Sequence, residues 1–314
     1  MRRPNTRGRV LRYRLESAGL RLATGVLGTL PLPVAMRLAS AVAASVIRVG
    51  GRIRRIGLKN LAIAFPDKSE AERMAILVAS YRNLGRMAAE CAHLRELDAT
   101  NVGERVRFDD GGIWAREMVP HLASQGILVL TGHFGNWEMF AYVYGLLGYP
   151  VSLVHQTIKN PLVDAYVEGM RSGGGTQLFR KQEAARSVLR ALKKRALVVL
   201  PLDQNQSRRA GIFVDFFGLP ANTSDGMARI ALRTGAPIYP AFLVRDGDTA
   251  RHRIVILPRV EIASMADPDS AARELTQRCT AVLESMIRKH PDHWLWTHKR
   301  WRTRPLDEPE LYER

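Results

Sequence analysis

The residues with the clearest chemical potential are a histidine and a glutamate that follow a short apolar run. The run at residues 127–131 leads into Gly132 and His133, and Glu138 lies five positions beyond the histidine. Ligands of open α/β sheets bind beyond the carboxyl ends of the strands, where glycine lets the backbone approach closely. An imidazole there can take a proton from a hydroxyl. We therefore expect His133 to be a general base whose second ring N–H is accepted by Glu138.

Asn136 is expected to begin the helix that follows His133, because asparagine is a favoured N-cap residue. The positive end of that helix dipole would keep the imidazole neutral and therefore basic. We also expect backbone N–H groups of residues 132–136 to stabilise an oxyanion. Asn136 is accordingly a candidate substrate-binding residue.

A second histidine and acid share the same spacing. His93 and Asp98 lie at the end of a long helical pattern, without glycines or a preceding strand, so we interpret them as structural. The two cysteines, Cys91 and Cys279, fall within helical segments, and no G-x-S-x-G turn occurs. A covalent nucleophile is therefore not expected.

The elements that must position these residues alternate regularly along the chain. Apolar runs predict strands at 127–131, 151–154, 196–200 and 238–244, separated by helical segments at 136–147, 161–170, 182–194 and 224–234. This alternation predicts an α/β fold with a mainly parallel sheet flanked by helices.

Further signals extend the scaffold on both sides. Ser69 and Glu72 form a capping box that opens a long helix before the sheet. Asp246-Gly247 predicts a hairpin turn into a strand at 253–257, and a last helix is expected near 270–289. Trp294, Trp296 and Trp301 follow it and are expected to be core residues or interfacial anchors.

Composition places the chain among ordinary globular proteins. It has 314 residues, of which 46% are hydrophobic and 25% charged, which argues against a disordered protein, a collagen-like fibre or a coiled coil. Two cysteines make neither a disulfide framework nor a C-x-x-C metal site. The sequence predicts no cofactor and no bound metal.

The net charge of +17 is concentrated in two segments. Residues 1–60 hold thirteen Arg or Lys, beginning with Arg2 and Arg3, against the single acid Glu16, and they enclose the uncharged stretches 22–36 and 38–47. We predict two amphipathic helices, at 10–30 and 33–49, that anchor the chain to an anionic membrane on its cytoplasmic face. Residues 61–314 would form the α/β domain.

Two other interpretations of the N-terminal segment remain open. A signal peptide also has a basic start and an apolar centre, although the basic run after Arg37 fits cleavage poorly. A nucleic-acid-binding arm would carry stacking aromatics, yet residues 1–60 contain only Tyr13. We therefore expect no nucleic-acid partner.

Several segments together resemble a known family. The first segment, His133 to Glu138, reads H-F-G-N-W-E. Four others follow it in order: Asn160-Pro161 with Asp164 and Arg171, the strand end Pro201-Leu202-Asp203-Gln204-Asn205, F-V-D-F-F-G at 213–218 and W-T-H-K-R-W at 296–301. The chain is similar in these motifs to the lipid A late acyltransferases, also called lauroyl/myristoyl acyltransferases. Almost the whole chain takes part in the resemblance.

The resemblance implies an enzyme that moves a fatty acyl chain from an acyl-carrier-protein thioester to a hydroxyl of a membrane glycolipid at the inner membrane. In that family the H-x4-D/E pair, here His133 and Glu138, is catalytic. Arg171 would bind a phosphate of the acceptor. Asp203 would bind acceptor hydroxyls or orient Arg171, and Asn205 in the loop beyond it would reach the site.

One departure from the family concerns the acceptor. His155-Gln156 stands where relatives often carry Tyr-Arg, so a phosphatidylinositol mannoside or a lysophospholipid is the alternative acceptor. An alternative of another class is a non-enzymatic basic protein that binds anionic membrane or nucleic acid. The second basic cluster, residues 288–304, is expected to help dock the acidic acyl carrier protein.

Overall fold

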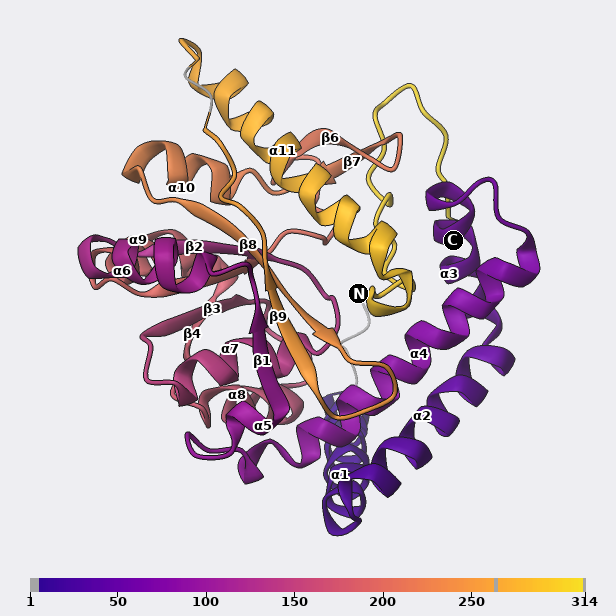
Figure 1. The fold of residues 1–314 in the computed structure, drawn as a ribbon. Coiled ribbons are helices and arrows are strands. Elements are labelled where there is room, and N and C mark those ends of the chain that lie inside the picture. The colour runs from indigo at the N-terminus through magenta and orange to yellow at the C-terminus, as the bar shows by residue number, and fades with distance from the viewer. Residues whose placement is uncertain (1–5, 263–264, 313–314) are drawn as a thin grey trace.

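The computed structural model describes residues 6–262 and 265–312, and side chains from residue 8 onward. Arg2 and Arg3 of the expected basic segment therefore lie outside the described residues. A seven-stranded sheet forms the centre, in the order β1-β9-β8-β2-β5-β3-β4 (Figure 1). Its strands are β1 (Val106–Asp109), β2 (Ile127–Thr131), β3 (Val151–His155), β4 (Gln177–Arg180), β5 (Leu197–Pro201), β8 (Ile238–Arg245) and β9 (His252–Ile256).

All neighbouring pairs in this sheet are parallel except β8 and β9, which form the hairpin expected around Asp246-Gly247. A separate antiparallel pair, β6 (Ile212–Phe216) and β7 (Leu219–Thr223), lies outside the sheet. The α/β fold and its mainly parallel sheet are thus confirmed.

Alternate residues of the central strand β2 face two helical layers, because side chains of a strand point to opposite faces. Ile127 and Val129 pack in one core with α7 (Trp137–Leu146). Leu128 and Leu130 pack in the other with α9 (Ala184–Lys193), α10 (Gly226–Thr234) and α11 (Pro268–Lys289). Every residue of β2 is buried, as expected for a central parallel strand.

Most of the remaining helical elements after residue 92 are short. They are η1 (Leu94–Glu96), α5 (Val102–Arg105), η2 (Trp114–Met118), α6 (Val119–Ser124), α8 (Pro161–Ser172), η3 (Lys181–Glu183) and η4 (Pro291–His293). The four helices expected between the strands and the last helix are all present, with ends shifted by a few residues.

The N-terminal segment folds as helices α1 (Thr6–Thr29), α2 (Leu32–Val49) and α3 (Gly51–Ala64), and all three contact α4 (Glu70–Ala92). The two helices expected within residues 10–49 are confirmed. Helix α4 begins at the expected Ser69–Glu72 capping box. A Cβ on Gly85 would lie 2.3 Å from the Ala39 carbonyl oxygen, so glycine is what lets α2 approach α4 so closely (Figure 1).

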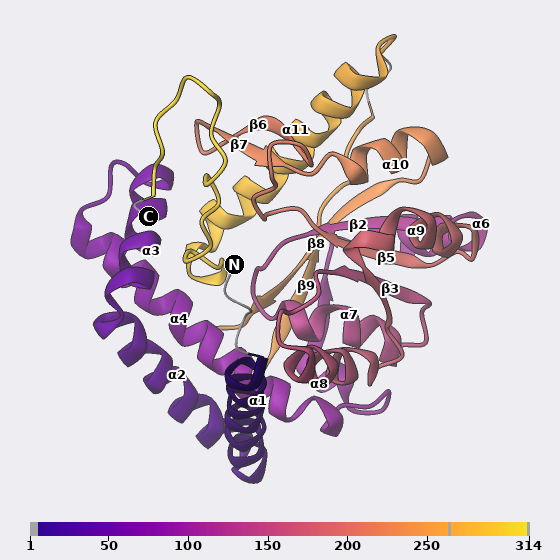
Figure 2. The ribbon, with the colours of Figure 1, turned by 180° about the vertical axis from the view of Figure 1, so that it is seen from behind.

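Helix α3 runs across residue 60, the expected domain boundary, without a break. Helix α1 lies beside α8 (Figure 2), where Asn160 Nδ2 donates to the Tyr13 carbonyl and the Tyr166 hydroxyl donates to Thr24 Oγ1. Helix α2 is long and apolar enough to cross a bilayer, and 28% of it is buried inside the protein.

The C-terminal segment is more deeply buried than its charge suggested. Trp294, Trp296 and Trp301 are core residues, as expected. Arg300 and Arg304 are also buried, and the Arg300 guanidinium donates to the Asn222 carbonyl and to Thr223. The expectation of one basic surface at residues 288–304 was therefore wrong for these two arginines.

Candidate active site

His133 and Asp203 occupy equivalent positions at the ends of neighbouring strands. Strands β2 and β5 are parallel, and Thr131 pairs with Pro201 in their register. His133 lies two residues after Thr131, and Asp203 lies two residues after Pro201. The paired strands therefore place His133 and Asp203 side by side beyond the carboxyl edge of the sheet.

The two side chains form a tightly fixed pair. His133 Nδ1 lies 2.9 Å from Asp203 Oδ1, and the His133 backbone N–H donates to Asp203 Oδ2 at 2.8 Å. The indole N–H of Trp294 donates to the same Oδ2 at 3.0 Å. A carboxylate that accepts from Nδ1 assigns the proton to that nitrogen and leaves the lone pair on Nε2. Gln204 Nε2 lies 3.2 Å from this Nε2, in the position that an acceptor hydroxyl would take.

The pKa shifts agree with an ionised Asp203 that stabilises the protonated form of His133. Burial by itself would raise the pKa of Asp203, but the His133 ring and the hydrogen bonds from His133 and Trp294 outweigh it and hold that pKa well below its usual range. Burial would lower the pKa of His133, but the Asp203 carboxylate raises it. The Asp203 carboxylate therefore shifts the pKa of His133 upward, in the direction opposite to the one expected from the helix dipole.

Glu138 was expected to accept a hydrogen bond from the His133 ring, but its hydrogen bonds are made to other residues. Its two carboxylate oxygens accept from Arg171 Nε and Nη2, both at 2.6 Å, and Trp137 Nε1 donates to it at 3.0 Å. The bidentate pair with Glu138 fixes the Arg171 guanidinium. Arg171 nevertheless lines the cavity that His133 faces. Asp203 orients His133, not Arg171.

The turn that carries His133 is fixed by its glycine and by a backbone hydrogen bond. Gly135 has φ +59°, and a Cβ there would lie 1.8 Å from the Leu243 carbonyl oxygen. Its N–H donates to the His293 carbonyl at 2.8 Å. The backbone N–H groups of His133, Phe134 and Gly135 all donate hydrogen bonds to acceptors within the protein. These three do not supply the oxyanion donors expected from residues 132–136.

Asn136 is the N-cap of α7, as expected, but it does not line the cavity. It is fully buried; its side-chain oxygen accepts from the Met139 N–H, and its Nδ2 donates to Glu90 Oε2 at 2.7 Å. The expectation that Asn136 binds substrate was wrong, because both ends of its amide are already used.

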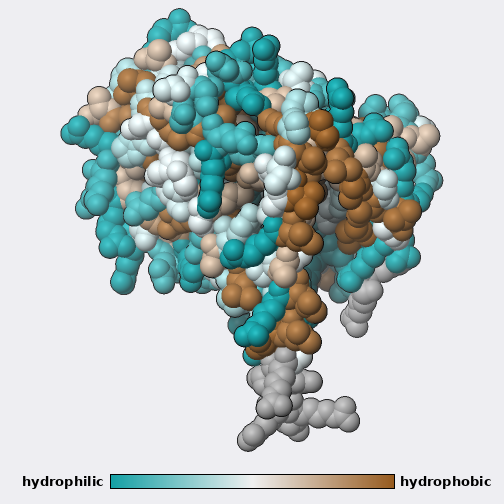
Figure 3. Space-filling model, turned by 90° about the horizontal axis from the view of Figure 1, so that it is seen from below, coloured by the Kyte–Doolittle hydropathy of each residue, from teal (hydrophilic) through white to brown (hydrophobic). Residues whose placement is uncertain are grey.

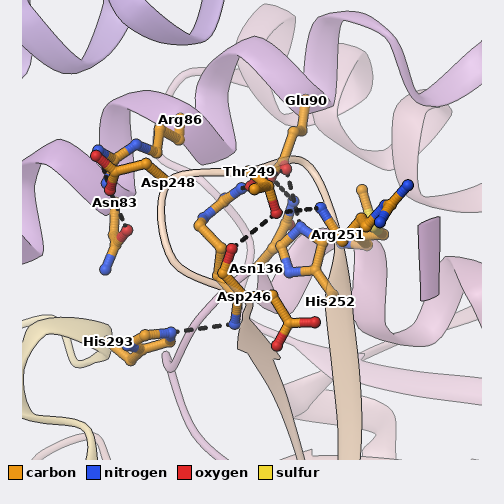
Figure 4. A network of polar contacts seen from close by, with 12 residues as sticks. Asn83, Arg86, Glu90, Asn136, Asp246, Asp248, Thr249, Arg251, His252 and His293 are labelled. Atoms are coloured by element: carbon orange, nitrogen blue, oxygen red, sulfur yellow. Dashed lines mark hydrogen bonds and ion pairs between the residues drawn. The ribbon is translucent and has the colours of Figure 1, made fainter. Parts of the chain in front are cut away.

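Glu90 of α4 is the centre of a buried polar network behind the turn that carries His133 (Figure 4). Its carboxylate accepts from Arg245 Nη1 and Nη2 at 2.5 and 2.6 Å and lies 2.8 Å from His252 Nε2. Burial would raise the pKa of Glu90, but His252 and Arg245 lower it to about 2. The network thereby connects α4, β8 and β9 to the residue that begins α7.

Asn205 ties its loop to the C-terminal segment instead of reaching the cavity. Its backbone N–H donates to His298 Nε2 at 3.0 Å, and its amide side chain exchanges hydrogen bonds with Thr303. Arg208 and Arg209 farther along the loop are exposed. The expectation of substrate binding at Asn205 is therefore not supported by its contacts.

The other candidates have structural roles. His93 contacts Glu96 and the Leu27 carbonyl, whereas Asp98 accepts hydrogen bonds from Thr100 and Asn101. Both cysteines are free, and burial raises the pKa of each thiol. The interpretation of His93 and Asp98 as a structural feature is confirmed.

A cavity of about 550 Å³ opens at the His133–Asp203 pair. Its polar lining includes His133, Gln204, Arg171, His155 and Lys181. Its apolar lining includes Leu153, Val154, Val199, Leu200, Ala184, Ala185, Met227 and Ile230. A histidine whose Nε2 lone pair meets the Gln204 amide at one wall of a largely apolar cavity suits proton removal from a polar group that displaces this amide and whose reaction partner carries a hydrocarbon chain.

Comparison with known proteins agrees with this chemistry. The profile of the family described as bacterial lipid A biosynthesis acyltransferase matches residues 2–303. The chain belongs to this family. It is 27% identical over 285 residues to the lipid A biosynthesis palmitoleoyltransferase of Escherichia coli K12, covering 90% of each chain. It is 26% identical over 287 residues, again 90% of each chain, to the lauroyltransferase of the same organism.

The protein is thus an acyltransferase, and its resemblance to that family is confirmed. A third relative, the E. coli K12 lipid A biosynthesis myristoyltransferase, is 24% identical over 85% of this chain and 80% of its own. In this acyltransferase the sequence motifs did not predict that Asp203 contacts the His133 ring or that Gln204 lies beside His133 Nε2. The signal available in the sequence was that His133 and Asp203 each follow a predicted strand within three residues.

Proposed function

We propose that this acyltransferase moves a fatty acyl chain from an acyl-carrier-protein thioester to a hydroxyl of a membrane glycolipid of the lipid A precursor type. The observation that carries the proposal is the His133–Asp203 pair at the wall of a largely apolar cavity. The names of the relatives support the acceptor class.

In the proposed reaction His133 Nε2 takes the proton of the acceptor hydroxyl as its oxygen attacks the thioester carbonyl. Asp203 stabilises the imidazolium that forms. When the tetrahedral intermediate collapses, the C–S bond breaks and the imidazolium returns the proton to the leaving thiolate. The products are an ester and the free thiol, and no acyl-enzyme is needed.

The carrier would dock at a basic pocket of about 230 Å³ between α3 and the C-terminal segment. Arg52, Arg55, Lys59 and Lys299 line it. The first three side chains are exposed, whereas Arg300 of the originally expected cluster is buried. Clustered positive charge steers an acidic partner and speeds its association at low salt.

Purified protein should transfer a labelled acyl group from the carrier thioester to a lipid A precursor in mixed micelles. Exchanging Arg52, Arg55 and Lys59 for glutamate should raise KM for the carrier roughly tenfold at low ionic strength, with little change in KM for the acceptor. The control variant exchanges Arg186, Arg251 and Arg259, which are exposed elsewhere on the protein, for glutamate. Equal effects of both triple variants would contradict this docking site.

The acceptor panel should include a lysophospholipid and a phosphatidylinositol mannoside. His155 and Gln156 both line the cavity, so the departure from the family pattern lies where an acceptor would be recognised. Faster transfer to one of these lipids than to the lipid A precursor would replace the proposed acceptor while leaving the chemistry intact.

The N-terminal helices support a place at the cytoplasmic face of the inner membrane. Apolar side chains are exposed along α1 and α2, and they gather on one face of the molecule (Figure 3); they include Val10, Leu11, Leu15, Leu22, Val26, Val34, Leu38, Val42, Val46 and Val49. Arginines at 9, 12, 14, 37 and 48 lie among them. Such a surface suits an anionic membrane interface.

Replacing Leu11, Leu22 and Leu38 by glutamine should weaken binding to vesicles of anionic phospholipid more than roughly tenfold, since burying one leucine is worth about 1.5–3 kcal/mol. All three side chains are 48–69% exposed, so the fold should survive. Leu147→Gln with Leu306→Gln, exposed on other elements, is the control. Unchanged vesicle sedimentation of the triple variant would place the membrane contact elsewhere.

A further inference from the structure

Three possible metal ligands converge beside the cavity from two neighbouring elements. His155 ends β3, and Asp164 and Glu168 stand four residues apart on α8. One ligand atom from each lies within 4.8 Å of the others, and His155 Nε2 is 3.5 Å from Glu168 Oε1. Side chains four apart share a helix face, so both carboxylates point toward the imidazole.

The imidazole of His155 has no hydrogen-bond partner among the described residues. Its side chain is 5% exposed, and neither ring nitrogen is hydrogen-bonded. Buried polar groups are normally paired, so an unpaired imidazole calls for an explanation.

Apart from one backbone contact, the two carboxylates are paired among the described residues with a single cation, the Arg180 guanidinium. Asp164 Oδ1 accepts from the Ile158 N–H at 2.8 Å, and Asp164 Oδ2 lies 3.7 Å from Arg180 Nη2. Glu168 Oε1 accepts from Arg180 Nε and Nη2 at 3.2 and 3.1 Å, and its Oε2 accepts from Nη2 at 3.4 Å. Arg180 pairs with His155 in the register of β3 and β4, and its side chain is 51% exposed. It can therefore leave toward solvent and be replaced by another cation.

We propose that His155, Asp164 and Glu168 form a binding site for a divalent transition metal of the zinc type. One imidazole with two carboxylates is a donor set that Zn²⁺ accepts at about 2.0–2.2 Å, and a tetrahedral ion at those lengths sets its ligands roughly 3.4 Å apart. The 3.5 Å between His155 Nε2 and Glu168 Oε1 matches that edge. The sequence predicted no bound metal, and these three ligands do not form a recognised spacing motif.

Such an ion would lie in the wall of the cavity, since His155 lines it. Three protein ligands leave a coordination position open. That position would hold an anionic oxygen of the acceptor lipid, a role that rests on the proposed function. Binding of the ion itself does not depend on that function.

The test is metal binding by the purified full-length protein after removal of metals with a chelator. Isothermal titration with ZnCl₂ should give one site per chain, and Co²⁺ should give the visible absorption of a tetrahedral ion. His155→Ala should weaken binding at least roughly tenfold. Arg180→Gln should strengthen it, because the competing cation is gone.

His121→Ala removes a histidine at another location and should leave the affinity unchanged. Glu168→Gln, on a partly exposed side chain, provides a second ligand variant if His155→Ala does not fold. Absence of a site in both the wild type and Arg180→Gln would overturn the proposal, as would binding that survives His155→Ala. His133→Ala should bind Zn²⁺ normally, so failure of the transfer chemistry and failure of the metal site are distinguishable.

Discussion

Replacement of His133 by alanine is expected to lower kcat/KM for acyl transfer roughly 10²–10⁴-fold, because it removes the proposed general base. Asp203→Asn should lose a comparable factor, since the amide no longer fixes the His133 tautomer or stabilises the imidazolium. Initial rates with the carrier thioester and acceptor in micelles measure both. The melting temperature must be recorded alongside, because Asp203 is buried and also accepts from Trp294.

Glu138→Gln is the informative comparison. It should also lower the rate, because the fixed position of Arg171 depends on the bidentate pair. It leaves the His133–Asp203 contact intact, so much of its effect is expected in KM for the acceptor. Asp98→Asn should behave like the wild type, because Asp98 only stabilises its own loop. Wild-type activity in His133→Ala would contradict the proposed mechanism.

The second large effect concerns stability. Glu90→Gln is expected to lower the free energy of unfolding by about 3–5 kcal/mol, the usual cost of leaving a buried charge without its partner. In this variant Arg245 stays buried and loses the carboxylate that it contacts through both terminal nitrogens. Chemical denaturation of the detergent-solubilised protein measures the difference.

The pH dependence adds a signature to that measurement. The pKa of Glu90 is about 2 in the folded state against an ordinary 4.5. Its stabilisation is therefore fully present above pH 4.5 and is lost as the pH falls toward 2, a loss that Glu90→Gln should not show. Glu72→Gln on the same helix is the control, because the Glu72 side chain is exposed and glutamine also completes a capping box. Equal stability of Glu90→Gln and the wild type would show that the network is dispensable.

Local patterns predicted the fold because the sheet is buried on both faces. Continuous apolar runs such as 127–131 and 196–200, each followed by a helical segment, are typical only of parallel strands covered on both sides. The capping box at Ser69 and the Asp246-Gly247 turn fixed two further boundaries for local reasons. The burial of Arg300 was not predictable in this way, because its partners Asn222 and Thr223 lie some eighty residues earlier.

The candidate site was predictable in part. Position after a strand indicated His133, but spacing along the chain indicated Glu138 as its partner, and the contact is made by Asp203, 70 residues away. That contact depends on the register of β2 with β5, which one sequence does not reveal. Asn136 was assigned correctly as a cap, yet its burial beneath Glu90 depends on how α4 packs against the turn that carries His133.

The most direct test of the central claim is the pH dependence of kcat/KM in the wild type and in Asp203→Asn. A general base must be unprotonated, so the rate falls as the pH drops through the pKa of His133. Since the Asp203 carboxylate raises that pKa above its ordinary 6.5, the acidic limb of the wild type should lie above pH 6.5. It should move to lower pH in Asp203→Asn and move less in Glu138→Gln. An acidic limb that shifts with Glu138→Gln but stays in place with Asp203→Asn would contradict the assignment of Asp203 as the partner of the base.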